Sequence, residues 1–413
     1  MCNLPIPSIR ARPALLLVLL VLLAPACVNP RRAKPDYSRP LAHGAEALIP
    51  VGPGEARPDY RQQWIQRRDI LPALDRSIAW TKKPSATRYF PIAGIEHDRA
   101  LASLERFREV LVGSRSSAEF VERMDREFDV YRSAGWDGRG GGVLFTGYCT
   151  PIMDGSLEPG PEYRFPLYGL PADLVKDKEG AILGQRGEDG SVRPYPTRRE
   201  IERRRLFRGQ GLELVWLKDP LDAYIAHVNG SAIVRLPDGS LHRLGYAGKN
   251  GQPYASLRQA LEDAGEIEPG APGLPALRAW AARTPETRVL SFLQRNDSYV
   301  FFTPIDGTPH GSLNVPVTGE RTLATDKSLF PRGALVFVDT QLPAVGRPGK
   351  VPFRQIMFDQ DTGGAIRTAG RADIYLGEGE EAELRAGVTV AEGQLYYLFL
   401  REGGSTDALS PRL

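Results

Sequence analysis

The stretch FDQDTGGAIRTAGRADIYLG, from Phe358 to Gly377, decides how this chain is interpreted. It places Asp361 and Asp373 twelve positions apart, with the pair Gly363-Gly364 and two arginines between them. Three explanations fit these residues taken alone. They are a solvated hairpin, half of an aspartic-protease dyad, or a site at which one carboxyl group transfers a proton.

The triplet Asp361-Thr362-Gly363 is typical of aspartic proteases. Such an enzyme uses two aspartates that share one proton, and they normally come from two copies of the triplet. This chain has one copy. A homodimeric protease with one copy in each subunit would be far smaller than 413 residues, so the pattern disfavours a protease.

The composition is that of an ordinary globular protein, with 42% hydrophobic and 25% charged residues. A length of 413 residues is enough for two domains, or for one domain with a large insertion. The formal net charge of +3 is small for this length and argues against a dedicated nucleic-acid binder. The basic run RREIERRRLFR, residues 198–208, is therefore expected to be a solvated helix face.

The N-terminus has the pattern of an export signal, which we assign to residues 1–27. Two arginines precede an apolar core from Ala14 to Ala24, which is shorter than the ~20 residues of a membrane span. The following APAC resembles a bacterial lipobox and would place a lipid anchor on Cys27. Ala24-Pro25-Ala26 also fits ordinary signal peptidase, so both routes stay open.

Cysteine and histidine usage predicts neither a disulfide nor a metal site. Cys2 would leave with the signal and Cys27 would become the N-terminus, which leaves Cys149 without a partner. The chain has five histidines and no H-x-x-H or C-x-x-C spacing. We expect no metal and no cofactor.

The pattern of the chain is helical first and mainly β afterwards. Residues 28–61 are rich in proline and predict a flexible tether. Helical spacing predicts helices over 70–83, 96–114 and 117–135. Short β-type runs follow between residues 142 and 248, and one of them covers 212–230. A helical interlude over 253–296 comes next, and a second β-rich part begins after Tyr299. This order predicts an α+β, mainly β chain with barrel-like β domains.

Seven stretches between Phe145 and Gly377 follow one another in a recognisable order. They read FTGYCTP, YRFPLYGLP, LVWLKDPLDAYIAHVNGSAIVRLPDG, GYAGKNGQPYASL, NDSYVFF, LATDKSLFPRGALVFV and DTGGAIRTAGRADIYLG. Together they resemble the membrane-bound lytic murein transglycosylase A (MltA) family, which carries a C-terminal three-aspartate, or 3D, domain.

The resemblance implies a double-psi β-barrel, formed by residues 62–154 and 304–413, with a second β domain inserted over 155–303. A glycan strand of peptidoglycan would lie in a groove between them. The reaction would break the MurNAc–GlcNAc β-1,4 bond without water and leave a 1,6-anhydro-MurNAc end. The protein would be a monomer, anchored by lipid at the periplasmic face of the outer membrane.

The resemblance also assigns roles to residues. The catalytic acid falls on Asp373, with Asp361 as its close neighbour and Asp326 as the third aspartate. The implied substrate-binding residues are Asp326, Tyr148, Thr150, Asn229, Gly230, Ser231, Gly363, Gly364 and Arg371. Two motifs depart from the family. Cys149 stands where a second aromatic residue is usual, and Asn229 begins a motif that usually reads QGSG.

The chemistry of Asp373 agrees with that role. Glycoside cleavage needs a carboxylic acid that stays protonated near neutral pH, which apolar walls or a nearby like charge achieve. Ile366, Ile374 and Tyr375 are apolar neighbours in sequence, Asp361 would supply the charge, and Arg371 would oppose both effects.

One carboxyl group is enough for this reaction. The C6 hydroxyl of the sugar replaces water, and an oriented intramolecular group acts at an effective concentration of ~10⁵–10⁸ M. The competing hypothesis is a glycan-binding protein of the same fold that has lost turnover.

Overall fold

The computed structural model describes residues 35–402, apart from residues 179, 181, 270, 272 and 365. The expected signal peptide and Cys27 lie outside this range. None of the described helices is long and apolar enough to cross a membrane.

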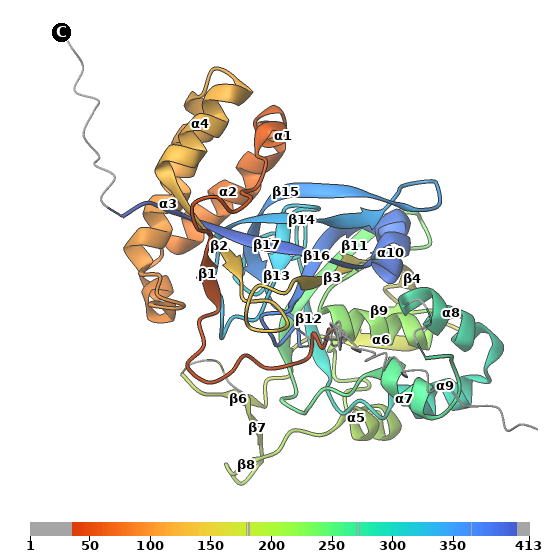
Figure 1. Ribbon diagram of the computed structural model, residues 1–413. Helices are drawn as coiled ribbons and strands as arrows, with labels where there is room; N and C mark the ends of the chain where they lie inside the picture. The colour runs from red at the N-terminus through yellow and green to blue at the C-terminus, as the bar shows by residue number, and fades with distance from the viewer. Residues whose placement is uncertain are drawn as a thin grey trace, which may run out of the picture. The chain divides into compact units, whose positions relative to one another are not determined.

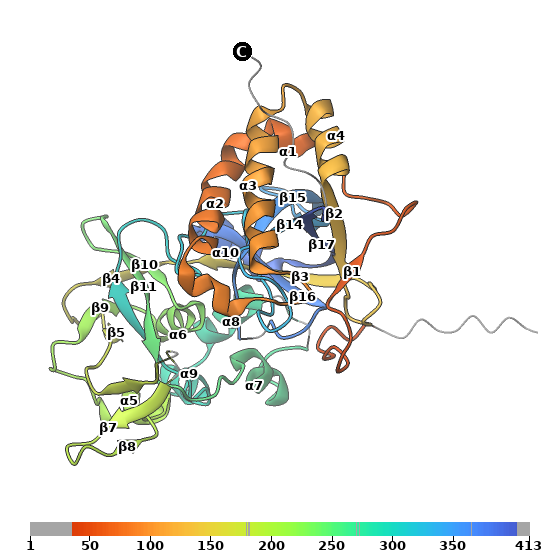
Figure 2. The same ribbon diagram turned by 90° about the vertical axis from the view of Figure 1, so that its left-hand side faces the viewer.

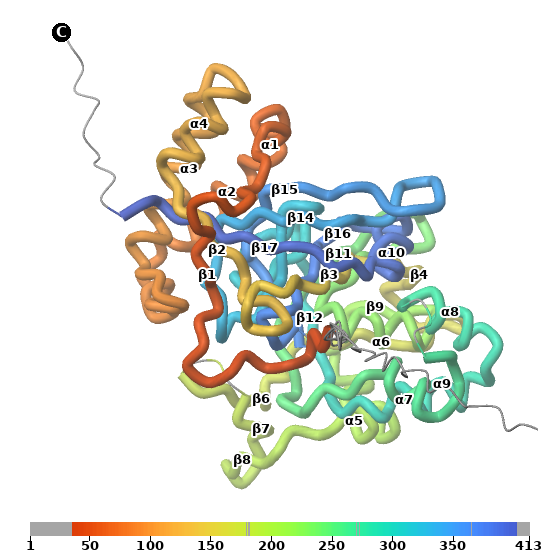
Figure 3. Tube along the Cα trace, in the orientation of Figure 1, coloured from red at the N-terminus to blue at the C-terminus, as the bar shows by residue number. Residues whose placement is uncertain are grey.

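Eight strands form the first sheet, in the order β1-β2-β17-β14-β15-β13-β16-β3 (Figure 1). Because β17 also pairs with β3, six of them, from β17 round to β3, close into a barrel. Figure 3 shows β3, from the first half of the chain, beside β16 and β17 from its end. The strands are β1 (Leu48–Pro50), β2 (Phe128–Ser133), β3 (Val143–Thr150), β13 (Thr322–Ala324), β14 (Leu335–Pro343), β15 (Lys350–Asp361), β16 (Arg371–Glu378) and β17 (Val390–Leu400).

Alternation along the strands separates the barrel interior from its outer surface. On β14, Val336 and Val338 fill the interior, while Phe337 faces the N-terminal helices. On β16, Ala372 and Ile374 fill the interior. Asp373 and Tyr375 therefore lie on the outer surface of the barrel.

The N-terminal helices cover one side of the barrel (Figure 2). They are α1 (Arg61–Ile65), α2 (Arg67–Thr81), the 3₁₀ helix η1 (Pro84–Tyr89), α3 (His97–Gly113) and α4 (Ser117–Glu127). The helices predicted over 70–83 and 96–114 are confirmed. The helix predicted over 117–135 is wrong beyond Glu127, because Phe128 and Val130 alternate inward as part of β2 and pair with β17.

The tether predicted for residues 28–61 is wrong for its later residues. Leu48–Pro50 forms β1, which pairs with β2, and Leu48 and Tyr60 are buried. Tyr60 packs edge-on against Phe337 of the barrel. The prolines of this segment prevent a helix, but Leu48 and Tyr60 still pack into the hydrophobic cores.

A second sheet has the order β12-β11-β10-β4-β9-β5, with a small sheet β6-β7-β8 beside it. Its strands are β4 (Ile152–Ser156), β5 (Phe165–Tyr168), β9 (Glu213–Leu217), β10 (Ala232–Arg235), β11 (Leu241–Lys249) and β12 (Val300–Pro304). The small sheet holds β6 (Leu174–Lys176), β7 (Ile182–Arg186) and β8 (Val192–Arg193). All of these strands lie in the chain between β3 and β13, so the second sheet is inserted into the barrel.

Helices cover the inserted sheet and surround its own core, which includes Trp280 and Phe292. They are α5 (Arg198–Arg204), α6 (Pro220–Asn229), α7 (Leu257–Asp263), α8 (Gly273–Arg283) and α9 (Glu286–Leu293), while α10 (Gly379–Val388) belongs to the barrel. The helical interlude predicted over 253–296 is confirmed.

The β character predicted for all of 212–230 is wrong in its second half, which is α6. The Asp219 side chain caps this helix by accepting a hydrogen bond from the Leu221 N–H at 2.7 Å, and Pro220 takes the first helical position. Gly230 ends the helix in the left-handed conformation, at φ 70°. These signals were present in the sequence, but the apolar residues between them resembled a strand.

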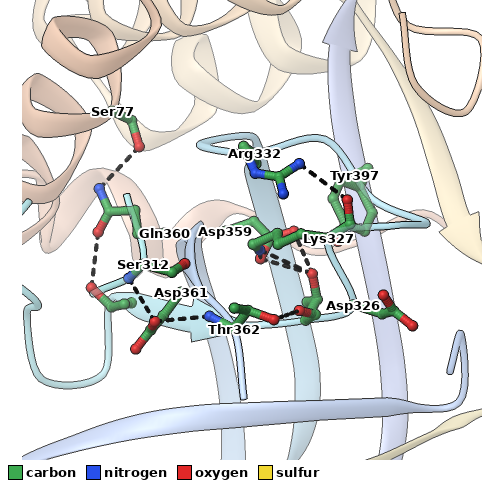
Figure 4. Close-up of polar contacts among 12 residues, drawn as sticks. Ser77, Ser312, Asp326, Lys327, Arg332, Asp359, Gln360, Asp361, Thr362 and Tyr397 are labelled. Carbon is green, nitrogen blue, oxygen red and sulfur yellow. Dashed lines mark hydrogen bonds and ion pairs between the residues drawn. The ribbon is translucent and has the colours of Figure 1, made fainter. Parts of the chain in front are cut away.

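A buried ion pair joins the end of β13 to β15 (Figure 4). The Lys327 ammonium contacts the carboxylate of Asp359, which is fully buried. The hydroxyls of Thr325 and Tyr397 also donate to that carboxylate, at 2.7 and 2.8 Å. Thus every charge in this interior cluster is compensated, although burial lowers the pKa of Lys327.

We expect Lys327→Met to lower the free energy of unfolding by about 3–5 kcal/mol, because it leaves the Asp359 charge buried without a cation. The double variant Lys327→Met/Asp359→Asn should recover most of that loss. Chemical denaturation gives both values.

Arg354→Met is the matched control, since it breaks the exposed pair Arg354–Asp339 (3.1 Å) on the neighbouring ladder and should cost under about 1 kcal/mol. Equal small losses for Lys327→Met and Arg354→Met would contradict the stabilising role of the buried pair.

Candidate active site

Strands β15, β13 and β16 bring Asp361 of the FDQDTGG segment and Asp373 of the RAD segment into one row. Ala324 of β13 pairs with Asp361 of β15 on one side and with Asp373 of β16 on the other. Asp373 in turn pairs with Thr146 of β3. Paired positions present their side chains on the same face, and neighbouring strands are about 4.8 Å apart. The row Asp361-Ala324-Asp373-Thr146 therefore lies across the outer surface of the barrel.

An irregularity in β15 directs its two aspartates to different places. The register between β13 and β15 shifts between the pairs Thr322–Phe358 and Ala324–Asp361. Asp359 consequently reaches Tyr397 in the barrel interior, whereas Asp361 joins the outer row. Such irregularities commonly redirect a side chain near an active site.

Three donors hold the carboxylate of Asp361. Its Oδ2 accepts a hydrogen bond from the Tyr148 hydroxyl at 2.7 Å. Its Oδ1 accepts from the backbone N–H groups of Ser312 and Thr362, each at 2.8 Å (Figure 4). These donors and the Lys327 charge favour the carboxylate, while burial acts against it and raises the pKa of Asp361 above its ordinary value. Both oxygens of Asp361 are thus occupied.

Asp373 has the opposite environment. Its Oδ1 is buried and has no hydrogen-bond partner among the described residues. Burial raises the pKa of Asp373 to about 6, with a further contribution from the charge of Asp361, although Thr146 and Arg371 lower it. The effect of burial on the pKa of Asp373 is therefore larger than the effect of Arg371, a balance that the sequence alone did not decide. A carboxyl group with this pKa is partly protonated near neutral pH, as a general acid must be.

Two tyrosines flank the carboxyl groups on the same face. The rings of Tyr148 and Tyr375 are 5.1 Å apart between centroids. The Thr150 hydroxyl lies 2.9 Å from the Tyr375 hydroxyl. Thr150 is buried and contacts Tyr375 through this pair, and the substrate contact predicted for it stays a prediction. Sequence reasoning missed Thr146 and Tyr375 as polar groups of the site, although alternation from Asp373 and Tyr148 would have found them.

Cys149 lies on the opposite face of β3, in the barrel core. It is a buried free thiol, and burial raises its pKa to about 12. The departure from the family at this position consequently removes no group from the face that carries Asp373.

Asp326 does not join the row. It is buried, and its Oδ1 accepts hydrogen bonds from the N–H and the hydroxyl of Ser328, at 3.0 and 2.7 Å. Figure 4 shows its carboxyl group directed away from Asp361. One carboxylate oxygen of Asp326 thus caps a turn, and the substrate contact implied for this residue stays a prediction.

The remaining predicted residues border the row. Arg371 precedes Asp373 by two positions on β16, and its buried Nε has no partner among the described residues. Gly363 and Gly364 follow Asp361, and Gly364 has open space around it. The motif that begins at Asn229 lies next to the end of β3, because the Ile233 N–H donates to the Pro151 carbonyl at 3.1 Å. The described residues contain no group of three His, Cys, Asp or Glu side chains able to hold a metal ion.

Two family models match the chain. The MltA specific insert domain matches residues 144–303, and the 3D domain matches residues 321–399. The first match covers the inserted sheet, and the second covers the strands that carry Asp361 and Asp373.

Known relatives and solved structures agree with these matches. The chain is 32% identical to membrane-bound lytic murein transglycosylase A of Vibrio cholerae over 271 residues, which cover 65% of this chain and 68% of the relative. It is similar in structure to a membrane-bound lytic murein transglycosylase from Agrobacterium tumefaciens, with a TM-score of 0.70, 27% identity, and 86% and 98% of the two chains covered.

A structure of the Escherichia coli protein with bound chitohexaose gives a TM-score of 0.62, 25% identity, and 87% and 97% coverage. The chain belongs to the membrane-bound lytic murein transglycosylase A family.

Proposed function

We propose that this protein is a lytic murein transglycosylase that breaks the MurNAc–GlcNAc β-1,4 bond of peptidoglycan and leaves a 1,6-anhydro-MurNAc end. The enzyme class is that of its relatives, and the E. coli structure with chitohexaose supports a glycan strand as the ligand. The observation that carries the assignment of residues is the pair of unlike carboxyl groups. Asp373 has an unpartnered buried oxygen and a raised pKa, beside an Asp361 whose oxygens are both occupied.

Asp373 would act first as acid and then as base. It protonates the glycosidic oxygen, the GlcNAc end leaves, and positive charge develops at C1 of MurNAc. The carboxylate of Asp373 then takes the proton of the C6 hydroxyl as that oxygen attacks C1. The proton lost in the first step returns in the second, and no water is consumed.

Asp361 would support both steps without forming a bond to the sugar. Its three donors leave no oxygen free to act as a nucleophile. Its negative charge favours the protonated form of Asp373 and the positive charge that develops at C1. A hydrolase needs a second carboxylate to activate water, and Asp361 is instead hydrogen-bonded to its three donors.

We further propose that the barrel is of the double-psi type and that the glycan strand lies between it and the inserted domain, residues 155–303. The closed six-stranded order and the parallel pairs β13–β15 and β16–β3 support the first point. An ion pair between Arg243 of the insert and Glu378 of β16, at 2.9 Å, supports the second, because it fixes the insert beside the site.

Asp373→Asn should reduce the release of 1,6-anhydro-muropeptides by ~10²-fold or more, because the amide transfers no proton at neutral pH. Glycan binding should persist. Asp238→Asn is the control, since it changes an exposed turn cap, in which Asp238 Oδ1 accepts hydrogen bonds from the Ser240 N–H and hydroxyl, and it should leave turnover unchanged. Mass spectrometry of digested sacculi measures the product, and thermal unfolding checks the fold.

A near wild-type rate for folded Asp373→Asn would contradict the assignment. Unchanged glycan binding with no product from the wild-type protein would instead favour the alternative, a binding protein of the same fold.

The pH dependence should follow the protonation of Asp373. Since the acid form is active and the pKa is about 6, kcat/KM should fall about tenfold for each pH unit above that value. Asp361→Asn removes a neighbouring negative charge, which lowers the pKa of Asp373, so the same fall should begin at lower pH, and turnover should fall less than in Asp373→Asn. A profile that is flat from pH 6 to pH 8 would rule out Asp373 as the acid.

The chain is also expected to be exported as a monomeric lipoprotein of the outer membrane, with its lipid on Cys27. The apolar core before APAC carries this proposal, and the relatives are named membrane-bound. Cys27→Ser should release the mature protein from membranes in a fractionation experiment. Failure of labelled fatty acid to enter the wild-type protein would show that Ala26 is an ordinary cleavage site.

A further inference from the structure

The inserted domain contains a cavity of about 470 Å³ that the proposed reaction does not use. We call it the insert pocket. It lies among β5, β9, α5, α6 and α9, and none of the residues of the Asp373 row line it. Its volume is within the range of small-molecule sites.

The floor of the insert pocket carries a neutral hydrogen-bond donor of fixed orientation. His227 Nδ1 accepts a hydrogen bond from the Val300 N–H at 3.0 Å, so the proton of the ring is on Nε2. Burial and the nearby charge of Arg198 hold the pKa of His227 well below its ordinary value. The Nε2–H has no partner among the described residues and is the polar atom that this ring leaves to the cavity.

The pocket has an excess of positive charge. Four arginines and two glutamates line it, and both glutamates are already paired. Glu202 accepts from Arg198 at 3.1 Å, and Glu286 accepts from Arg164 at 3.0 Å.

Arg205 and Arg208 are the two cations left over. Both are exposed at the rim and have no acidic partner among the described residues. Tyr168 lines the same pocket, and burial raises its pKa to about 12; the charges of Glu213 and Glu202 raise it further, and those of Arg208 and Arg205 lower it. The Tyr168 hydroxyl also has no hydrogen-bond partner in the described part of the chain.

Aromatic side chains form the remaining wall. Tyr163, Phe165 and Trp216 line the pocket and are partly exposed. Such rings provide apolar contact area at a small cost in side-chain entropy. A ligand that matches the pocket has carboxylate groups for the guanidinium groups and an apolar or amide body for the rings and His227.

We propose that the insert pocket binds the peptide stem of peptidoglycan, whose free carboxylates meet Arg205 and Arg208. This inference rests on the proposed function, because it assumes the same polymer as substrate. A neutral glycan would leave both guanidinium groups unpaired, whereas a stem peptide supplies carboxylates, amides and apolar side chains together. The pocket then gives the enzyme a contact to peptide-bearing strands away from the scissile bond.

The test uses the free stem peptide, which has no glycosidic bond, and the mature full-length chain in titration calorimetry. The double variant Arg205→Gln/Arg208→Gln should bind the peptide roughly tenfold or more weakly, since two charge-assisted contacts are lost. Arg199→Gln/Arg204→Gln is the matched control. It removes the same charge from the same segment, outside the pocket lining, and should keep wild-type affinity.

A second variant separates binding from folding. Tyr168→Phe keeps the ring contact with Phe207 and removes only the hydroxyl, so it should weaken peptide binding several-fold without changing thermal unfolding. Chitohexaose, which has no peptide, reports on the glycan groove, and its affinity should be independent of Arg205 and Arg208.

Two results would overturn the proposal: no binding of free peptide to the wild-type chain, or equal affinity in Arg205→Gln/Arg208→Gln and its control. Neither depends on turnover. Loss of the proposed function would appear separately, as absence of anhydro-muropeptides.

Discussion

The site depends on one constraint, the position of the short strand β13 between β15 and β16. Ala324 pairs with Asp361 and Asp373 at the same time, so the two aspartates lie on either side of its small side chain. A strand of three residues contributes few ladder hydrogen bonds of its own. Its end is held by the Thr362 hydroxyl, which donates to the Thr325 carbonyl at 2.9 Å, and by the Lys327–Asp359 pair beneath it. The ion pair inside the barrel and Asp373 on its outer face are therefore held by the same short strand.

Burial decides the chemistry of Asp373 against an unfavourable neighbour. Arg371 lies on the same face of the same strand and stabilises the carboxylate, yet the pKa is about 6. Keeping this carboxyl group ionised at neutral pH costs the folded state about 3 kcal/mol relative to an ordinary aspartate. That cost follows first from burial of the carboxyl group, whose Oδ1 has no donor among the described residues. Asp361, on the other side of β13, has three donors, so the same residue type has two different environments and, in the proposed mechanism, two roles.

The sequence allowed much of the architecture to be predicted, through patterns that act locally. Helices α2 and α3 followed from apolar spacing, and the strands after Tyr299 followed from alternation. The errors arose where tertiary pairing overrides local pattern. Phe128–Ser133 continues a helical pattern in the sequence but pairs with β17 as a strand. The residues that pair with β1 lie 81 to 85 positions further along the chain.

The site was predictable only in part, for the same reason. Asp361 and Asp373 were identified from their motifs, but the row that unites them depends on a register shift in β15 and on barrel closure. Neither is visible in residue spacing. The partners of Asp326 and Thr150 were equally hidden, because neither the turn that Asp326 caps nor the hydroxyl pair of Thr150 and Tyr375 follows from residue spacing. The insert pocket is lined by residues from five helices and strands, so no local sequence motif predicts it.

The insertion itself has a mechanical consequence for a single-carboxyl mechanism. The insert leaves the barrel after Thr150 of β3 and returns through β12 to β13. Strands β3 and β13 are the two neighbours of β16, which carries Asp373. Two further ties act across the junction. Arg243 binds Glu378 at 2.9 Å, and Arg278 bridges Asp222 of α6 and Glu383 of α10. Each tie is partly buried, so each restricts motion more than an exposed pair would.

An enzyme that uses one acid and the substrate's own hydroxyl obtains its rate from positioning, since neither a second carboxylate nor water compensates for a misplaced sugar. The sugar must lie with its C6 oxygen near C1 and its glycosidic oxygen near Asp373 at the same time. The groove proposed between barrel and insert would meet that requirement before the substrate arrives, because its two walls are joined by chain and by ion pairs. In the proposed mechanism the insert is thus as much a part of the catalytic arrangement as the barrel that carries Asp373.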